Sequence, residues 1–173
     1  MPTLTATLAT APDAAAVFAL LASAGAHLAA HGYSNWQPPY PRERIERDIS
    51  AGAVWIVRDS ASDGTPVATY MLRAAPVRAY TGIVWGAPDA NARYLNRLAV
   101  HATRMGEGIG AWCLAYIAEC CARDGVSAVR CDVVAGNLPL RRFYERAGYE
   151  VRGAREHSGW EFAVYETLIA NNG

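Results

Sequence analysis

The sequence predicts an α/β (α+β) domain in which helices and one mixed sheet form three layers. Strand and helix patterns follow the order β-α-α-β-β-β-α-β-α-β-β, and strand–helix–strand units in the middle of the chain favour a mixed sheet. The 173 residues have the length of one domain, so we expect residues 1–173 to fold together. Hydrophobic residues make up 52% and charged residues 18%, a composition typical of globular proteins rather than disordered chains.

Three local signals set the elements of the first half of the chain. Apolar residues alternate or run together in the expected strands, and they recur at helical spacing between Asp13 and Gly32. Three prolines around Trp36 favour a fixed irregular loop over 33–41. We therefore expect a strand over 3–8, a helix from 12–13 to Gly32, a short polar helix over 42–50, and a hairpin of strands 54–57 and 66–72 with its turn at 60–64.

The second half begins with the least regular region, residues 74–93. A loop of this length inside a compact domain typically has a function or is mobile. Beyond it, strand and helix patterns alternate again until the end of the chain. We expect a strand over 94–100, a helix over 108–123, a strand over 128–134, a helix over 138–147 closed by Gly148, and a hairpin of strands 149–156 and 160–168.

The charged residues exclude several kinds of chemistry. All sixteen basic residues are arginines, and they balance sixteen acidic residues. Without lysine, the chain has no Walker-type phosphate lysine, no Schiff-base lysine and no Ser-Lys dyad. A neutral chain also lacks the basic excess of nucleic-acid and anionic-membrane binders, so we expect neither partner.

The sequence favours a cytoplasmic location. The Ala-rich stretch 14–30 lacks the charged n-region of a signal peptide, and it is weakly hydrophobic and slightly short for a membrane span. The four cysteines form no CxxC pair, which favours buried thiols in a reducing cytosol over a disulfide framework or a zinc site. His27 and His31 stand four residues apart without a third ligand, so we expect no metal.

Glycines at alternate positions open the helix expected over 108–123. Gly106, Gly108 and Gly110 remove side chains where a backbone approaches a ligand, and a helix start offers unpaired N–H groups. A phosphate or pyrophosphate is the natural ligand, and a tight turn without a ligand is the alternative. The spacing fits neither the dinucleotide fingerprint nor the P-loop.

Two motifs in this region resemble the GCN5-related N-acetyltransferase (GNAT) superfamily. The first is the strand ending Leu98-Ala99-Val100 followed by the glycine-rich turn, and the second places Tyr144 seven positions after Asn137, followed by Glu-Arg-Ala-Gly-Tyr. The resemblance implies a GNAT-like fold: a mixed, largely antiparallel sheet of about seven strands, with splayed central strands and helices on both faces. It also implies an enzyme that transfers acetyl from acetyl-CoA to an amine by direct attack in a ternary complex.

The resemblance further implies roles for the residues of both motifs. The backbone of Leu98, Ala99 and Val100 would pair with the pantetheine amides, a form of strand addition. Asn137 would bind the pantetheine arm, and Tyr144 would protonate the departing thiolate. The remaining residues expected to bind the cofactor are Arg104, Met105, Gly106, Glu107, Gly108, Ile109, Gly110, Ala111, Leu140 and Arg141. Met105 departs from the Gln or Arg usual in the family, so we expect weakened binding.

Each of these residues also has a structural interpretation. Asn137 stands where a helix N-cap is expected. Tyr144 is suited to anchor an amphipathic helix, next to Phe143. Arg141 and Arg142 fit a solvated helix face as well as a clamp on the CoA phosphates.

The acceptor is expected to be a small-molecule amine. Aromatic residues gather in the expected loops and favour a cation or flat amine by cation–π and stacking contacts, although they could instead close the core. The residues expected to contact the acceptor are Trp36, Trp85, Tyr94 and Asn96. Asn96 cannot take a proton but could orient a water, and the sequence does not rank Glu43, Asp48, His101 and Asp132 as the base. We expect deprotonation through water, with the oxyanion held by backbone N–H near Val100.

Other functions stay open at this point. The same fold could serve as a non-catalytic acyl-CoA-binding module or acetylate protein N-termini or side chains, and a homodimer is possible. A Ser or Cys hydrolase would need a G-x-S-x-G elbow or a Cys–His pair in context, and neither is visible.

Overall fold

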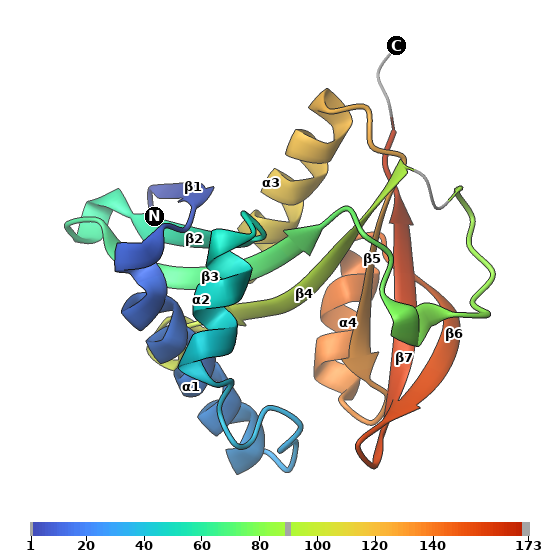
Figure 1. Ribbon diagram of the computed structural model, residues 1–173, viewed down its shortest axis with the longest axis horizontal. Coiled ribbons are helices and arrows are strands. Elements are labelled where there is room, and N and C mark those ends of the chain that lie inside the picture. Colours follow the sequence, from blue (N-terminus) through green and yellow to red (C-terminus); the bar gives the residue numbers. More distant parts are fainter. Residues whose placement is uncertain (1, 89–90, 171–173) are drawn as a thin grey trace. The chain divides into compact units, whose positions relative to one another are not determined.

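The computed structural model describes residues 2–88 and 91–170, and its elements follow the order predicted from the sequence (Figure 1). Four α-helices are described: α1 (Ala14–Ala30), α2 (Arg42–Ser50), α3 (Ile109–Arg123) and α4 (Leu138–Arg146). The seven described strands are β1 (Leu4–Leu8), β2 (Val54–Asp59), β3 (Thr65–Arg73), β4 (Ala92–Val100), β5 (Ala128–Val134), β6 (Glu150–His157) and β7 (Trp160–Leu168).

The strands form one mixed sheet, in the order β1-β2-β3-β4-β5-β7-β6. β4 and β5 run parallel, whereas β1–β2, β2–β3, β5–β7 and β6–β7 are antiparallel. This topology confirms the predicted fold class. Packing divides the chain into two compact units: unit 1 is Met1–Leu72 with Arg97–Gly110, and unit 2 is Arg73–Asn96 with Ala111–Gly173.

Helix α1 supplies the core of unit 1. Its stripe of Val17, Leu20, Leu21 and Ala24 is buried and packs with Ile45 of α2 in one cluster, and Figure 1 shows the two helices side by side. The expectation that the stretch 14–30 is slightly short for a membrane span needs correction. With the preceding turn, the segment Ala11–Ala30 is long and apolar enough to cross a membrane by length and composition alone. Burial of one stripe is what the helical spacing of these apolar residues predicts.

The strands β1, β2 and β3 of unit 1 pair with one another, and Asp59 lies at the end of β2. β2 pairs with β1 from Trp55 to Asp59 and with β3 over its whole length, with a register shift between Val57 and Arg58. β2 extends two residues beyond the predicted end at Val57, which places Asp59 at the strand terminus, next to the η2 turn (Ser60–Ser62). β4 leads into the η5 turn (Ala102–Arg104), and the His101 amide donates to the Val67 carbonyl of β3.

Unit 2 contains the antiparallel strands β5, β7 and β6. β7 pairs with β5 from Phe162 to Leu168, and the start of β4 pairs with β5 over three residues. Most of the long loop predicted over 74–93 is irregular, with a short η3 turn (Arg78–Tyr80), and β4 begins at Ala92 rather than Tyr94. Residues 89 and 90 of that loop lie outside the described residues.

Candidate active site

The glycine-rich loop of unit 1 presents backbone donors. Gly106 and Gly108 have φ of +85° and +82°, the left-handed region that glycine enters without penalty. A Cβ at either position would meet nothing within 4 Å, so the backbone conformation, not crowding, requires glycine here. In the part of the chain that the structure describes, the exposed amides of Gly106, Glu107 and Gly108 donate to no protein acceptor. Such a run of N–H groups suits an anion.

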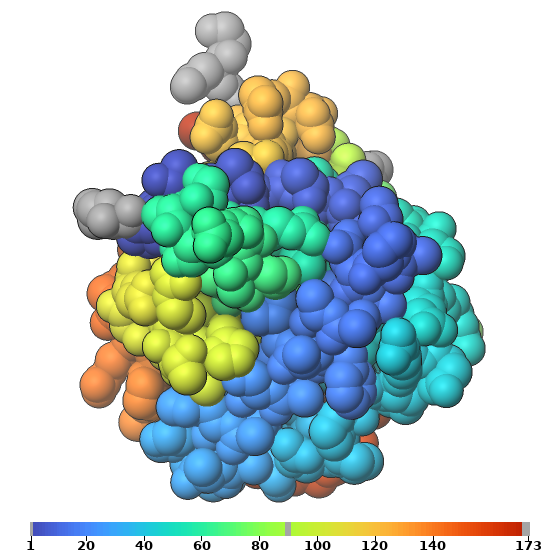
Figure 2. Space-filling model, turned by 90° about the vertical axis from the view of Figure 1, so that its left-hand side faces the viewer, coloured from blue at the N-terminus to red at the C-terminus, as the bar shows by residue number. Residues whose placement is uncertain are grey.

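Arg104 connects this loop to the β2–β3 hairpin. Its Nε donates to both carboxylate oxygens of Glu107, at 2.8 and 2.7 Å, and its Nη2 donates to Asp59 Oδ2 at 2.9 Å. The hydrogen bond from Arg104 is the main cause that lowers the pKa of Asp59, with backbone donors adding to it. Figure 2 shows this face of unit 1, with the η5 turn and the loop (yellow) bordering the hairpin (green) and α1 (blue). The sequence did not indicate Asp59, because its partner is 45 residues away.

Strand β4 departs from regular geometry at Arg97. This residue has φ of +52°, which residues other than glycine rarely adopt. Its Nη1 lies 2.7 Å from Asp48 Oδ2, and its guanidinium lies 4.3 Å from the centre of the Tyr40 ring. Such strain costs about 1–3 kcal/mol and persists only where the surroundings impose it. It directly precedes Leu98–Val100, the segment expected to bind pantetheine.

The parallel pairing of β4 with β5 is short. Within unit 2 it runs from Ala92↔Ala128 to Tyr94↔Arg130, and no further pair of these two strands is recorded among the described residues. Both strands continue beyond that point, β4 to Val100 and β5 to Val134. The recorded pairing thus involves only the first three residues of β4.

Asn137 is the N-cap of helix α4, as the capping interpretation predicts. The Asn137 side chain is buried, and its Oδ1 accepts from the Leu140 amide at 3.2 Å. The Nδ2 group of Asn137 forms no hydrogen bond with the described residues, so it stays available to a ligand. Arg141 is half-buried and donates to the Tyr165 hydroxyl at 2.8 Å and to the Ala135 carbonyl at 3.2 Å, which ties α4 to β7.

Tyr144 lies on the buried side of α4. Its ring contacts those of Phe143, Tyr149 and Tyr165, with centroids 5.2, 5.3 and 6.4 Å away. Burial raises the pKa of its hydroxyl well above 10, and the nearby Cys131 adds to the shift. This surrounding fits the aromatic-anchor interpretation, and it also keeps the phenol protonated.

A carboxylate lies close to this tyrosine in unit 2. Asp132, on β5, accepts from Arg155 Nε at 2.7 Å through its Oδ2. It adds to the burial that raises the pKa of both Tyr144 and Tyr80. The Tyr80 hydroxyl is buried without a hydrogen-bond partner of ordinary geometry. Asp132 is therefore the base candidate that shares an electrostatic environment with Tyr144.

The other base candidates are engaged or exposed. Asp48 is paired with Arg97, and the His101 ring is hydrogen-bonded to Thr103. Glu43 is exposed on α2. Asn96, expected to orient a water, accepts from Arg73 Nη2 at 3.2 Å through its Oδ1.

The aromatic residues expected to contact the acceptor are distributed over both units. In unit 1, Trp36 is half-buried beside α1, where a Cβ on Gly25 would lie 3.3 Å from the Trp36 Cβ. Its ring meets that of Tyr40 edge to face at 5.9 Å. In unit 2, Tyr94 is fully buried and Trp85 packs against the same cluster. Both therefore also serve the core, as the alternative interpretation held.

An ion pair inside unit 2 organises the region around Trp85 and Tyr94. Arg130 and Glu166 have no exposed side-chain surface, and Arg130 Nε lies 3.0 Å from Glu166 Oε2. Arg130 also donates to the Tyr94 hydroxyl and stacks 4.0 Å from the centre of the Trp85 ring. Glu166 accepts from the Gly86 amide at 2.6 Å, which fixes the loop before β4. The feature of the sequence that could have indicated this ion pair is Arg130, a single arginine in the middle of an apolar strand.

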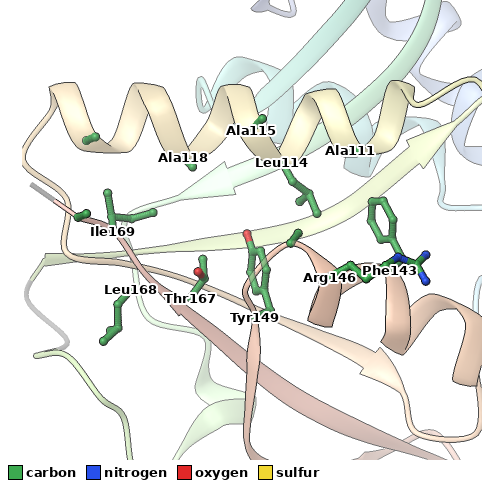
Figure 3. A pocket seen from close by; sticks show the side chains of 13 residues that line it. Ala111, Leu114, Ala115, Ala118, Phe143, Arg146, Tyr149, Thr167, Leu168 and Ile169 are labelled. Carbon is green, nitrogen blue, oxygen red and sulfur yellow. The ribbon is translucent and has the colours of Figure 1, made fainter.

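Unit 2 also contains a pocket of about 520 Å³ (Figure 3). Figure 3 shows α3 along one side of the pocket. Leu114 and Phe143 lie toward one end of the pocket, and Ile169 lies at the other end. Ala111, expected to bind the cofactor, is part of the pocket lining. The lining is Ala111, Leu114, Ala115, Ala118, Ala122, Phe143, Arg146, Ala147, Tyr149, Thr167, Leu168, Ile169 and Ala170.

Comparisons with known proteins agree with this fold. The sequence model of the acetyltransferase (GNAT) family matches residues 22–149. YesJ of Bacillus subtilis (strain 168), named as an N-acetyltransferase, is 30% identical over 147 residues, which are 82% of this chain and 79% of YesJ. The chain thus has the fold and motifs of an acyl-group transferase. It belongs to the GNAT family, and it is an N-acetyltransferase of that family.

Solved structures share the architecture at low sequence identity. A GNAT-family acetyltransferase from Streptococcus agalactiae 2603 superposes with a TM-score of 0.81 at 20% identity, over 95% of each chain. The ribosomal-protein-S18-alanine N-acetyltransferase of Escherichia coli gives 0.74 at 14% identity, over 99% of this chain and 97% of that one. The PaiA N-acetyltransferase of Thermoplasma acidophilum, solved in complex with coenzyme A, gives 0.71 at 17% identity, over 96% and 99%.

Proposed function

We propose that this enzyme takes acetyl from acetyl-CoA and transfers it to the amine of a small molecule. The observation that carries the donor is the exposed loop Gly106–Gly108, whose amides donate to no protein acceptor. A diphosphate is the kind of anion that several converging N–H groups bind. The PaiA structure with coenzyme A supports the same donor.

Each unit contributes its own part to this proposal. In unit 1, the loop would hold the diphosphate and the backbone of Leu98, Ala99 and Val100 would pair with the pantetheine amides. In unit 2, Asn137 Nδ2 would donate to the pantetheine arm, because Oδ1 already accepts from Leu140. The donor supplies an acetyl group activated as a thioester.

Tyr144 would give a proton to the departing sulfur. Burial keeps its hydroxyl protonated because it raises the pKa well above the usual value. A thiolate leaving in the same buried surroundings would have its own pKa raised, since desolvation disfavours either anion. The two groups therefore stay matched for proton transfer.

Asp132 would accept the amine proton through a water molecule. Arg155 contacts Oδ2 through both Nε and Nη2. Deprotonation before or during attack is needed because an ammonium has no lone pair. Backbone N–H near Val100 would hold the oxyanion.

Half-buried aromatic side chains support a small-molecule acceptor. Trp36 and Tyr40 meet edge to face, and the Tyr40 ring already carries the Arg97 guanidinium on its face. An aromatic face that holds one cation can hold another, so an amine would compete with Arg97 there. We propose Trp36 and Tyr40 as contributors to acceptor recognition.

A reducing compartment, the cytoplasm, is also part of the proposal. The four cysteines are free thiols in the described chain. Burial raises the pKa of Cys113 to about 12 and that of Cys121 to about 11, which keeps both thiols protonated and unreactive.

Two assays test the function. Thermal unfolding with added coenzyme A should show a rise in Tm, since a ligand that binds only the folded state stabilises it. A thiol-release assay with acetyl-CoA should then identify acceptors from a panel of small amines and peptide N-termini. Stabilisation without release by any amine would favour a binding module. Thiol release with peptides alone would indicate that the acceptor is a protein rather than a small molecule.

The variant Tyr144→Phe tests the proton donor. We expect kcat to fall by about 10²–10⁴-fold, the range for loss of a general acid, with little change in coenzyme A affinity. Tyr149→Phe is the matched control, because Tyr149 is also buried and its ring lies 5.3 Å from that of Tyr144. Equal turnover in Tyr144→Phe and the control would remove Tyr144 from the mechanism.

A further inference from the structure

The proposed diphosphate loop carries a negative side chain between its two left-handed glycines. Glu107 is exposed, and both of its carboxylate oxygens accept from Arg104 Nε. Arg104 in turn reaches Asp59 on β2. One guanidinium thus faces two carboxylates, and the formal charge of the three side chains is −1. A group of this sign opposes an anionic ligand unless its partners rearrange.

Asp59 holds Arg104 at a fixed place. The Asp59 side chain is 2% exposed, and apart from Arg104 it accepts from the amides of Thr3 and Ala61 and from the Ser62 hydroxyl. A carboxylate in this position cannot follow Arg104 into solvent, so the contact keeps the guanidinium beside the loop. Glu107 is the more mobile partner, because 39% of its side chain is exposed.

We propose that Glu107 occupies Arg104 in the free enzyme and that the diphosphate of acetyl-CoA displaces it. This inference rests on the proposed donor. Arg104 would then exchange a carboxylate for a phosphate while Asp59 keeps it in place, since guanidinium groups bind both anions through the same donor geometry. Asp59 is a positioning residue in this exchange, and Glu107 lowers the affinity for the donor that the loop would otherwise have.

The exchange predicts a gain on removing one charge. Glu107→Gln should lower the Kd for coenzyme A by about three- to five-fold, the size expected for releasing a half-exposed ion pair. It should raise kcat/KM for acetyl-CoA through KM, without a change in kcat. Acetyl-pantetheine carries the thioester but no diphosphate, so its kcat/KM should stay the same. Calorimetric titration with coenzyme A and steady-state kinetics with both thioesters measure these effects.

Two variants complete the test. Glu46→Gln is the matched control, because Glu46 is an exposed partner of Arg42 in the same unit and its loss should change neither thioester. Arg104→Lys keeps the charge but not the fork of donors, and it should raise the Kd for coenzyme A and leave acetyl-pantetheine unaffected.

The outcomes separate this inference from the proposed function. If the unmodified enzyme binds no coenzyme A, the donor assignment fails. If it binds coenzyme A and Glu107→Gln binds no more tightly, or binds less tightly, the pair orders the loop and the exchange is wrong. An equal change with acetyl-pantetheine would also overturn the exchange, since it would not depend on the diphosphate.

Discussion

The substitution Glu166→Gln tests whether the buried ion pair holds unit 2 together. Glu166 and Arg130 have no exposed side-chain surface, so the change leaves the guanidinium with a neutral amide. Oε1 also accepts from Arg152 Nε at 3.1 Å and from the Gly86 amide at 2.6 Å. A glutamine has one carbonyl oxygen and one NH₂ group, so it cannot accept from all three donors.

The expected loss follows from the burial of the charge. Removing one partner of a buried ion pair costs about 3–5 kcal/mol, because the other charge stays desolvated. Arg152 is 26% exposed, so it can turn to solvent, and we take the lower end of about 3 kcal/mol. For a chain of this size, each kcal/mol lowers Tm by about 2–4 °C, which gives a decrease of about 6–12 °C.

Urea unfolding and calorimetry of the same samples measure the loss. Glu150→Gln is the control, since Glu150 is 73% exposed and pairs with Arg152 at 3.3 Å, and we expect a change below about 0.5 kcal/mol. The double variant Arg130→Met/Glu166→Leu should recover part of the lost stability, because neither charge remains buried. A Glu166→Gln protein as stable as the Glu150→Gln control would refute the reasoning.

Two further predictions concern Asp132 and the dependence of stability on pH. Asp132→Asn should lower kcat, and an unchanged kcat would exclude Asp132 as the base. The folded-state pKa is lowered at Asp13, mainly by the Thr10 amide, and at Asp59, mainly by Arg104. The stabilisation by these two carboxylates is therefore present above the unfolded pKa of about 3.9 and is lost as pH falls through the folded pKa. In acid titrations of unfolding, Asp59→Asn should show a smaller loss of stability with falling pH than the unmodified protein.

The element order was predictable because it depends on local patterns. The helical spacing of Val17, Leu20 and Leu21 gave α1, and Gly148 ended α4 as expected. Boundaries moved where tertiary pairing extended a strand. β2 runs on to Asp59 because it pairs with β1 there, which the residues 58–59 alone do not indicate.

Side-chain partners far apart in the sequence could not be predicted. Arg130 and Glu166 meet across 36 residues, and their pairing depends on the register of β5 against β7. The sequence likewise does not show that the Tyr94 hydroxyl accepts from Arg130 inside unit 2. A sequence pattern places a residue on a face but does not show which residue faces it.

The sites of proposed chemistry in unit 1 coincide with departures from local preference. Gly106 and Gly108 adopt left-handed φ where no side chain would crowd them, and Arg97 adopts it despite its side chain. Burial does not explain the loop glycines, since they are exposed. Asp48 and Tyr40 hold the Arg97 side chain, and Asp59 holds that of Arg104 beside the loop. Water can satisfy the exposed N–H groups of the loop until a ligand replaces it, and these side-chain contacts hold the neighbouring residues in place.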